Sequence, residues 1–388
     1  MNNIIFIGLV SFFADLSAEM VYPLIPLYLT AVFGATPALV GLIEGIAESL
    51  ASLLKVFSGY ATDKYRKKKP IAFFGYATGL VYKLALILAG SWLGILGARV
   101  IDRFGKGIRT TPRDVLVSES SDSTKLGHSF GLHKALDMAG SAAGILAAYF
   151  ILRAGKGSYD YKRIFLLSSI PAVLSLFMFI FIKETGKPRT SKAPLHVFKG
   201  IKNLDARLKL YLVVVFIFTL GNSSNTFLLL RAQNVGFDGA TVVLLYFLYN
   251  AVSSLLALPL GRLSDRLGRK RILVGGYITF AIVYGAFAWA PNKAVVIGAF
   301  ALYGLFTAMT AGVERAFIAE IAPMELKGTM LGLHSTIVGI ALLPASVIAG
   351  LLWSAFGPVA PFALGAGLSM TAAIILSFGL KKPSSVSI

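Results

Sequence analysis

Apolar stretches of about twenty residues recur along the whole chain, and this feature constrains its fold most strongly. A helix of that length crosses the hydrocarbon core of a bilayer. Only 14% of the 388 residues are charged, against about a quarter in an ordinary soluble domain. We therefore predict an all-α polytopic membrane protein. Its twelve spanning segments are expected at 4–32, 38–61, 70–90, 92–117, 127–152, 163–183, 208–231, 239–261, 271–290, 294–321, 328–353 and 358–380.

The net charge of +19 does not indicate a nucleic-acid-binding protein, because the cations gather in short connections between apolar segments. Loops rich in Lys and Arg stay in the cytoplasm, and their distribution predicts that both termini lie there. The apolar start, MNNIIFIGLV, lacks the basic region and cleavage site of a signal peptide, so it is expected to belong to the first span. The chain has no cysteine, which excludes disulfide bonds and thiolate metal sites.

The sequence repeats itself at an offset of 201 or 202 residues. GYATDKYRKKK at 59–69 aligns with GRLSDRLGRKR at 261–271, and GHSFGLH at 127–133 aligns with GTMLGLH at 328–334. This offset predicts two homologous six-helix halves, at 1–183 and 208–388, joined by a cytoplasmic linker at 184–207. Repeats of this kind are typical of transporters, whose substrate site lies between the halves near the membrane midplane.

Six plus six helices, a central linker and a GxxxD loop after the second and eighth segments resemble the major facilitator superfamily. The stretches DLSAEMVYPLIPLYL, GLIEGIAESLASLLKVFSGYATD and RVIDRFGKGIRTTPRD are similar to a bacterial permease group of that superfamily, whose substrates are mostly unassigned. The resemblance implies a monomeric transporter of the bacterial cytoplasmic (inner) membrane. It works by alternating access, usually driven by a proton gradient, on a small-molecule substrate and without a cofactor.

The resemblance also implies a cytoplasmic gate at the loop motif. Asp63 would contact the start of the eleventh helix and an arginine of the fourth, while Gly59 would allow two helices to approach closely. The antiporter motif of the fifth helix is only half present, because Gly140 and Gly144 occur but Ile145 replaces its proline. The gating residues expected on this basis are Gly59, Asp63, Arg109, Arg113, Gly261 and Asp265.

Seven charged residues lie inside the fourth segment, in GARVIDRFGKGIRTTPRD at 97–114. At about 100° per residue, all seven share an arc of about 140° on one helix face. Such charges are costly in a membrane, so they should face a cavity or a partner. Axial rise places Asp15 and Glu48 about 18 Å from the cytoplasmic face, with Arg99 at a similar level. Asp102 and Arg103 are expected at the depth of Asp137.

The second half lacks most of these charges. Glu48 becomes Asn250 and Glu44 becomes Tyr246 at the 202 offset, and the two histidines of the repeated GLH need not carry protons. We therefore expect proton and charge chemistry in the first half and a neutral wall in the second. The charged residues left near the second half's helices are Glu314, Arg315, Glu320, His334 and Arg231. The predicted proton-coupling and substrate-binding residues are Asp15, Glu19, Glu44, Glu48, Arg99, Asp102, Arg103, Asp137, Asn222, Asn225, Tyr246 and Asn250.

These patterns favour proton-coupled export of a small cationic or amphiphilic compound. Proton-driven uptake of a metal ion, a metal chelate or a small metabolite stays open, because carboxylates suit hard cations. A purely structural role of the charges as ion pairs between helices also stays open. GKGIRT lacks the glycine and the Ser or Thr of a phosphate loop. An intramembrane enzyme is a remote alternative, because the chain has no HExxH motif and no cysteine; no catalytic or metal-ligating residue is expected.

Overall fold

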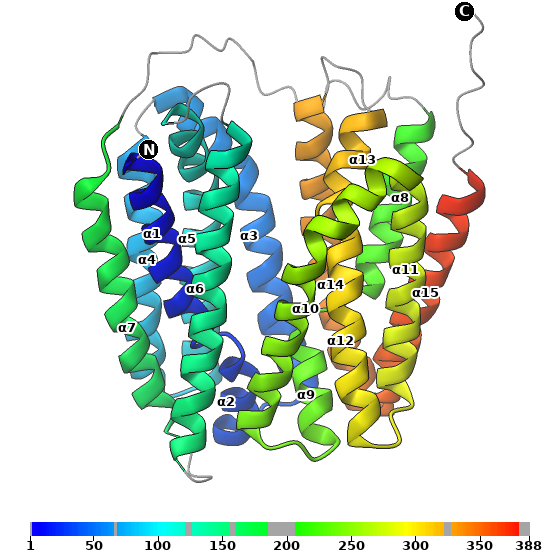
Figure 1. The fold of residues 1–388 in the computed structure, drawn as a ribbon. Coiled ribbons are helices and arrows are strands. Elements are labelled where there is room, and N and C mark those ends of the chain that lie inside the picture. Colours follow the sequence, from blue (N-terminus) through cyan, green and yellow to red (C-terminus); the bar gives the residue numbers. More distant parts are fainter. Residues whose placement is uncertain are drawn as a thin grey trace, which may run out of the picture. The chain divides into compact units, whose positions relative to one another are not determined.

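The computed structural model describes residues 2–65, 68–120, 126–155, 160–184, 206–321 and 327–379. These ranges are helical and contain no strand, and each of the twelve predicted segments is helical, so the predicted all-α class is confirmed. In chain order the helices (Figure 1) are α1 (Asn2–Glu19), α2 (Leu24–Phe33), α3 (Pro37–Tyr65), α4 (Lys68–Leu88), α5 (Trp92–Glu119), α6 (Leu126–Ala154), α7 (Tyr161–Met178), η1 (Phe179–Phe181), α8 (Ala206–Gly221), α9 (Thr226–Asn234), α10 (Gly239–Leu267), α11 (Arg269–Ala288), α12 (Lys293–Thr310), α13 (Val313–Ile321), α14 (Lys327–Phe356) and α15 (Val359–Gly379).

Three of the predicted segments are broken into two helices. The first is interrupted between α1 and α2, because Pro23 has no backbone N–H, and the amide of Leu24 bonds the carbonyl of Val21 at 2.9 Å. The seventh is interrupted at 222–225, where Asn and Ser side chains compete for backbone hydrogen bonds. The tenth is interrupted at 311–312.

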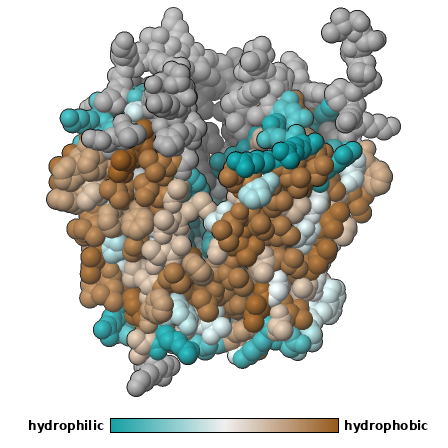
Figure 2. All heavy atoms as spheres, viewed as in Figure 1, coloured by the Kyte–Doolittle hydropathy of each residue, from teal (hydrophilic) through white to brown (hydrophobic). Residues whose placement is uncertain are grey.

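The surface of the helices is suited to lipid. Eleven stretches of the described residues are long and apolar enough to cross a membrane, and charge-rich α5 is not among them. Phe74, Leu88 and Phe150 are 75%, 83% and 64% exposed. Figure 2 shows hydrophobic residues over the middle of the helices and hydrophilic residues near their ends. Large apolar side chains exposed in this way are stable in a bilayer, and the chain is a multi-pass membrane protein.

The chain divides into two compact units. Unit 1 comprises Met1–Leu195 and Asn225–Phe247, and unit 2 comprises His196–Ser224 and Leu248–Ile388. Unit 1 therefore contains α9 and the first part of α10, which lie beyond the sequence boundary at residue 208. The halves 1–183 and 208–388 describe the internal repeat and stay a prediction.

Unit 1 is built around α5 and α1. Helix α5 packs against α3 and α4, and α1 packs against α6 and α7. Glycines permit these close crossings. An added Cβ at Gly105 would lie 2.7 Å from the carbonyl oxygen of Gly75 on α4, and one at Gly140 would lie 2.8 Å from the carbonyl carbon of Phe12 on α1. The two glycines of the half-present antiporter motif thus have a packing role, since Gly144 meets the backbone of Leu16 in the same way.

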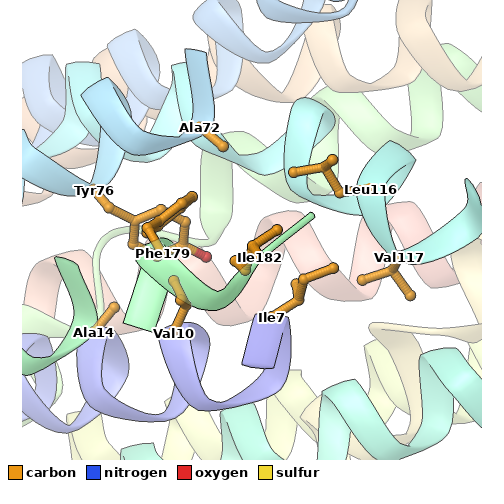
Figure 3. Packing of buried hydrophobic residues seen from close by; sticks show 9 residues of the cluster. All are labelled: Ile7, Val10, Ala14, Ala72, Tyr76, Leu116, Val117, Phe179 and Ile182. Atoms are coloured by element: carbon orange, nitrogen blue, oxygen red, sulfur yellow. The ribbon is translucent and has the colours of Figure 1, made fainter. Parts of the chain in front are cut away.

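An apolar cluster fills unit 1 where α1 and α4 begin and α5 ends. Figure 3 shows the ring of Phe179 beside that of Tyr76, and their centroids lie 5.3 Å apart. Tyr76 therefore has its ring in the apolar core, while its hydroxyl reaches the polar residues described below. The cluster consists of Ile7, Val10, Ala14, Ala72, Tyr76, Leu116, Val117, Phe179 and Ile182.

Candidate functional site

The charged face of α5 points into unit 1, as the predicted polar stripe requires. Arg99 and Arg103 are 1% and 4% exposed, whereas Phe104 on the other side of the helix is 45% exposed. Lys106 departs from the stripe because it is exposed. The buried members meet acids from α1, α3 and α6 at successive levels along α5.

The first level is a closed ion pair between α5 and α3. The guanidinium of Arg99 donates to both carboxylate oxygens of Glu44, from Nε at 2.9 Å and from Nη2 at 2.6 Å. Both side chains are 1% exposed. The ring of Tyr22 covers the pair, with its centroid 5.3 Å from the Arg99 Cζ. Two parallel charge-assisted hydrogen bonds without water make this a tight and geometrically specific contact.

The second level lies one turn further along α5. Arg103 Nη2 lies 3.0 Å from Glu48 Oε1, and its Nε lies 3.6 Å from Asp102 Oδ2. Asp102 also lies 3.7 Å from Arg99, so it bridges the two levels. The Arg103 Nε has no hydrogen-bond partner among the described residues. Glu44 and Glu48 are therefore both held by arginines in this structure.

The third level brings together two acids from different helices. The carboxyl groups of Asp15 on α1 and Asp137 on α6 lie close enough to act on each other. Their arginine neighbours are more distant than that of Glu44: Arg109 lies 4.0 Å from Asp15, and Arg113 lies 3.9 Å from Asp137. Asp137 also accepts a hydrogen bond of 2.6 Å from Lys134.

A chain of neutral polar groups extends from this level, and the sequence analysis did not find it. Ser11 Oγ lies 3.1 Å from the Tyr76 hydroxyl and 2.8 Å from the His133 Nε2. The Arg109 guanidinium lies 4.4 Å from the centre of the Tyr76 ring. Buried hydroxyl and imidazole groups in hydrogen-bonding contact can pass a proton along a chain.

Glu19 differs from the other acids of unit 1. It forms no ion pair with a described residue, and its Oε2 is buried without a hydrogen-bond partner in the described part of the chain. The groups that act on its carboxylate include the cation Lys106 and Tyr246, a residue of the second half that lies in unit 1. The ring of Tyr246 in turn lies 5.6 Å from that of Tyr22.

The predicted depths of the acids were wrong in part. Asp15 and Glu48 were expected at one level, but they contact Arg109 and Arg103, which are six residues and about 9 Å apart along α5. Arg99 meets Glu44 instead of Asp15 or Glu48. Axial rise alone ignores helix tilt and the length of an arginine side chain, and both shift the level at which charges meet.

Asp102 and Arg103 were likewise expected at the depth of Asp137, and this was wrong. Asp137 lies 3.9 Å from Arg113, which is ten residues further along α5 than Arg103. Its other cationic partner, Lys134, lies on α6. The same tilt and side-chain reach account for this difference.

The structure describes only some of the predicted gating residues. Gly59 and Asp63 lie on α3, and the side chain of Asp63 is outside the described residues. Asp265 Oδ1 lies 3.3 Å from Arg269, whose guanidinium also lies 3.1 Å from Glu320. An added Cβ at Gly261 would meet no described atom within 4 Å, so close helix packing does not explain this glycine.

The polar residues expected on a neutral wall fall into both units. Asn225 and Tyr246 lie in unit 1, whereas Asn222 and Asn250 lie in unit 2. The described residues contain no group of three or more His, Asp or Glu arranged to hold a metal ion. Two side chains that could offer oxygen atoms to a hard cation have other partners, because Ser17 donates to the carbonyl of Ser168 and Glu44 is bound to Arg99.

Lys83 on α4 is a buried cation that forms no ion pair with a described residue. It is 1% exposed, and its Nζ lies 4.7 Å from the centre of the Tyr82 ring. It lines a small cavity in unit 1 together with Asp102, Arg109 and Ser175, with a volume of about 10 Å³. A polar cavity of this size holds about one water molecule.

Replacing Lys83 with methionine is expected to raise the midpoint of thermal unfolding by a few degrees. The substitution keeps the length of the side chain and removes the cost of burying an unpaired charge. The midpoint can be measured on the purified protein in detergent. Lys162→Met is the matched control, because Lys162 is exposed, and no change is expected there. A lower midpoint for the Lys83 variant would show that the ammonium group stabilises the fold.

The helical fold and the charges buried within its spans define a polytopic membrane transporter. A family model described as "Major Facilitator Superfamily" matches residues 7–229 and 210–387. The chain belongs to the major facilitator superfamily.

Relatives and solved structures agree with this membership. An "Uncharacterized MFS-type transporter MJ1317" of Methanocaldococcus jannaschii is 38% identical over 383 residues, which cover 97% of this chain and 94% of that protein. A "Multi-drug resistance efflux pump PmrA homolog" of Lactococcus lactis is 30% identical over 46% of this chain and 45% of its own length. The crystal structure of the nucleoside transporter NupG matches with a TM-score of 0.80 over 98% of this chain and 100% of that one. At 12% identity the latter match concerns the fold alone.

Proposed function

We propose that this transporter works by alternating access and exports a small cationic or amphiphilic compound in exchange for protons. The partial similarity to a multidrug efflux pump supports export. The proposal places a monomer in the cytoplasmic membrane of a prokaryotic cell, with both termini in the cytoplasm. Asp63 with Gly59, and Asp265 with Gly261, would form a pair of cytoplasmic gates.

The contact between Asp15 and Asp137 carries the proposal of proton coupling. Two carboxyl groups can form a hydrogen bond with each other only when one of them holds a proton. Because Arg109 and Arg113 lie at about 4 Å, neither acid is locked by a close bidentate arginine. The pair can therefore gain or lose its proton when the surrounding helices move.

Glu19 supports the binding of a cationic substrate in the same unit. A buried carboxylate oxygen without a partner is costly, and a bound cation or proton removes that cost. Tyr246 acts on this carboxylate and contacts the ring of Tyr22, and the two aromatic rings offer a surface for an organic cation. Glu44 and Glu48, by contrast, would hold α3 against α5 and orient the arginines.

The contacts of the acids favour export over the uptake of a metal ion or chelate. A hard cation requires several carboxylate or carbonyl oxygens that converge on one point. In unit 1, Glu44 and Glu48 are each engaged with an arginine, and Ser17 with a backbone carbonyl. Uptake of a small metabolite remains the second candidate, because the same proton site would serve it.

Substitution of Asp15 or Asp137 with asparagine is expected to abolish proton-driven transport. Asparagine has nearly the size and shape of aspartate and can still form hydrogen bonds, but it cannot exchange a proton. The measurement is the flux of ethidium, an amphiphilic cation, across proteoliposome membranes under an imposed pH gradient. Each variant is expected to fall to the rate of protein-free liposomes, while the unmodified protein exceeds it.

Asp238→Asn is the matched control for this experiment. Asp238 is an exposed residue that accepts a hydrogen bond from Thr241 at the start of α10, and asparagine serves equally well there. Its flux should equal that of the unmodified protein. Undiminished pH-driven flux in both the Asp15 and the Asp137 variants would refute proton coupling at this pair.

A further inference from the structure

A second buried acid lies in unit 2, where the sequence predicted a neutral wall. The Tyr277 hydroxyl of α11 donates to Glu314 Oε1 of α13 at 3.2 Å. The other carboxylate oxygen of Glu314 lies 3.8 Å from the Nε2 of His334 on α14. The side chains of Glu314 and His334 are 19% and 11% exposed. Three helices thus bring a carboxyl group, an imidazole and a phenol together.

No strong cation neutralises Glu314 in the described part of unit 2. The described residues place neither a lysine nor an arginine within 4 Å of its carboxylate, and Arg315, its neighbour in sequence, is exposed. Helix α8 contributes Tyr211, and α11 contributes Arg269, which is bound to Glu320 and the carbonyl of Ala316. The only charged residue of α12, Lys293, lies at its far end. Among the described residues, His334 is the one potential cation within 4 Å of the Glu314 carboxylate, and Arg315 acts on that carboxylate from a greater distance.

Unit 1 has a corresponding group of residues, which the offset of the internal repeat identifies. Adding 201 to Tyr76 and His133 gives Tyr277 and His334, and adding it to Arg113 gives Glu314. In unit 1 the tyrosine and histidine share hydrogen bonds with Ser11, and Arg113 lies near Asp137. The two repeats thus place a tyrosine and a histidine at equivalent points. A permanent cation completes the group in unit 1, and a titratable acid completes it in unit 2.

The histidine nitrogen Nε2 also has fewer hydrogen-bond partners in unit 2 than in unit 1. His133 Nε2 has a hydrogen-bond partner in Ser11, at 2.8 Å. His334 Nε2 is buried and has no hydrogen-bond partner among the described residues. A single proton on either the Glu314 carboxylate or this nitrogen converts the pair into a donor and an acceptor. A small approach of the two groups, from 3.8 Å to hydrogen-bond distance, completes the contact.

We propose that Glu314 and His334 form a second proton-binding site, located in unit 2. The proton binds to a carboxylate oxygen of Glu314, where Nε2 of His334 can accept a hydrogen bond from it, and Tyr277 holds the carboxyl group in place. This site is separate from the Asp15 and Asp137 pair of unit 1. Only the role of this site in transport rests on the proposed function. In that role, the exchange cycle would move two protons for each monovalent cation and would therefore be electrogenic.

Infrared difference spectroscopy of the full-length protein in lipid nanodiscs tests the site without a transport assay. Lowering the pH should produce the C=O stretching band of a protonated carboxyl group, and Glu314→Gln should remove one component of it. His334→Asn should shift that component, because its hydrogen-bonding neighbour changes. Glu320→Gln is the matched control, since Glu320 is exposed and paired with Arg269. A spectrum unaltered by Glu314→Gln overturns the proposal.

Two further measurements separate this site from the proposed function. The Glu314 component should persist in the Asp15→Asn protein, whose pH-driven flux is lost. If Glu314→Gln does not fold, Glu314→Asp should keep the band and move its position; an unmoved band overturns the proposal. In proteoliposomes, a membrane potential set with potassium and valinomycin should drive ethidium flux in the unmodified protein but not in Glu314→Gln. Equal dependence on the potential in both proteins overturns the second proton of the cycle.

Discussion

Replacing Glu44 with leucine is expected to lower the free energy of unfolding by about 3–5 kcal/mol, because it leaves a buried arginine without its partner. Arg99 is 1% exposed and donates its close hydrogen bonds to Glu44, while Asp102 lies 3.7 Å away. The change can be measured as a lower midpoint of thermal or denaturant-induced unfolding of the purified protein. Under the proposed transport cycle, the carboxylate removed by this substitution does not gain or lose a proton.

A double variant, Glu44→Leu with Arg99→Met, distinguishes loss of the ion pair from loss of packing. Removing both charges and keeping apolar volume is often neutral for stability, so most of the lost stability should return. Glu320→Leu is the surface control, since its pair with Arg269 is 53% and 29% exposed and is worth less than about 1 kcal/mol. A double variant as unstable as the single one would mean that Glu44 acts by filling space.

Substitution of Gly140 with alanine is the second large effect that we expect. The added methyl group would overlap the backbone carbonyl of Phe12 on α1, and backbone atoms cannot move aside as a flexible side chain can. Forcing α1 from α6 should cost about 1–3 kcal/mol or more, and it should also displace Asp15 from Asp137. Unfolding midpoint and pH-driven ethidium flux should therefore both fall.

Gly97 provides the matched control for this substitution. It lies within α5, is exposed, and has no heavy atom within 4 Å of an added Cβ. Alanine at that position should be neutral or raise stability by up to about 1 kcal/mol, through its higher helix propensity. If Gly140→Ala behaves like Gly97→Ala, α1 and α6 are not held at the distance that this structure shows.

The positions of the helices were predictable because lipid imposes a simple rule on sequence. Spans of apolar residues separated by polar connections are sufficient to place α3, α6 and α15 to within a few residues. Helix α5 was also found, although its charges hide it from a hydropathy criterion, because those charges share one face. Breaks without proline, as between α12 and α13, carry a weaker signal.

The partners of the buried charges were harder to predict, since they depend on tilt and on side-chain reach. The sequence grouped Arg99 with Asp15 and Glu48, and the structure gives it to Glu44. An arginine side chain spans more than one helical turn, so the sequence alone allows several acids to be its partner. Only the packed arrangement of α3 and α5 decides among them.

The tyrosine and histidine groups of the two repeats left a signal that the sequence analysis did not use. Tyr76 and Tyr277 are separated by 201 residues, the same offset as His133 and His334. Aligned polar residues in a duplicated chain invite comparison of their neighbours. Ser11 could not be named in this way, because it reaches His133 from another helix.

The charges of α5 also have a consequence for how this protein is made. A single Arg, Lys or Asp at the centre of a span raises the apparent cost of insertion by about 2.5–3.5 kcal/mol, and α5 carries several. It therefore cannot leave the translocon for lipid as an independent span. Helix α3, which supplies Glu44 and Glu48, is synthesised before it and must stay nearby until α5 emerges. The acids of α1 and α3 that contact Arg99, Arg103 and Arg109 are thus already synthesised when α5 emerges, whereas Asp137 of α6 follows it.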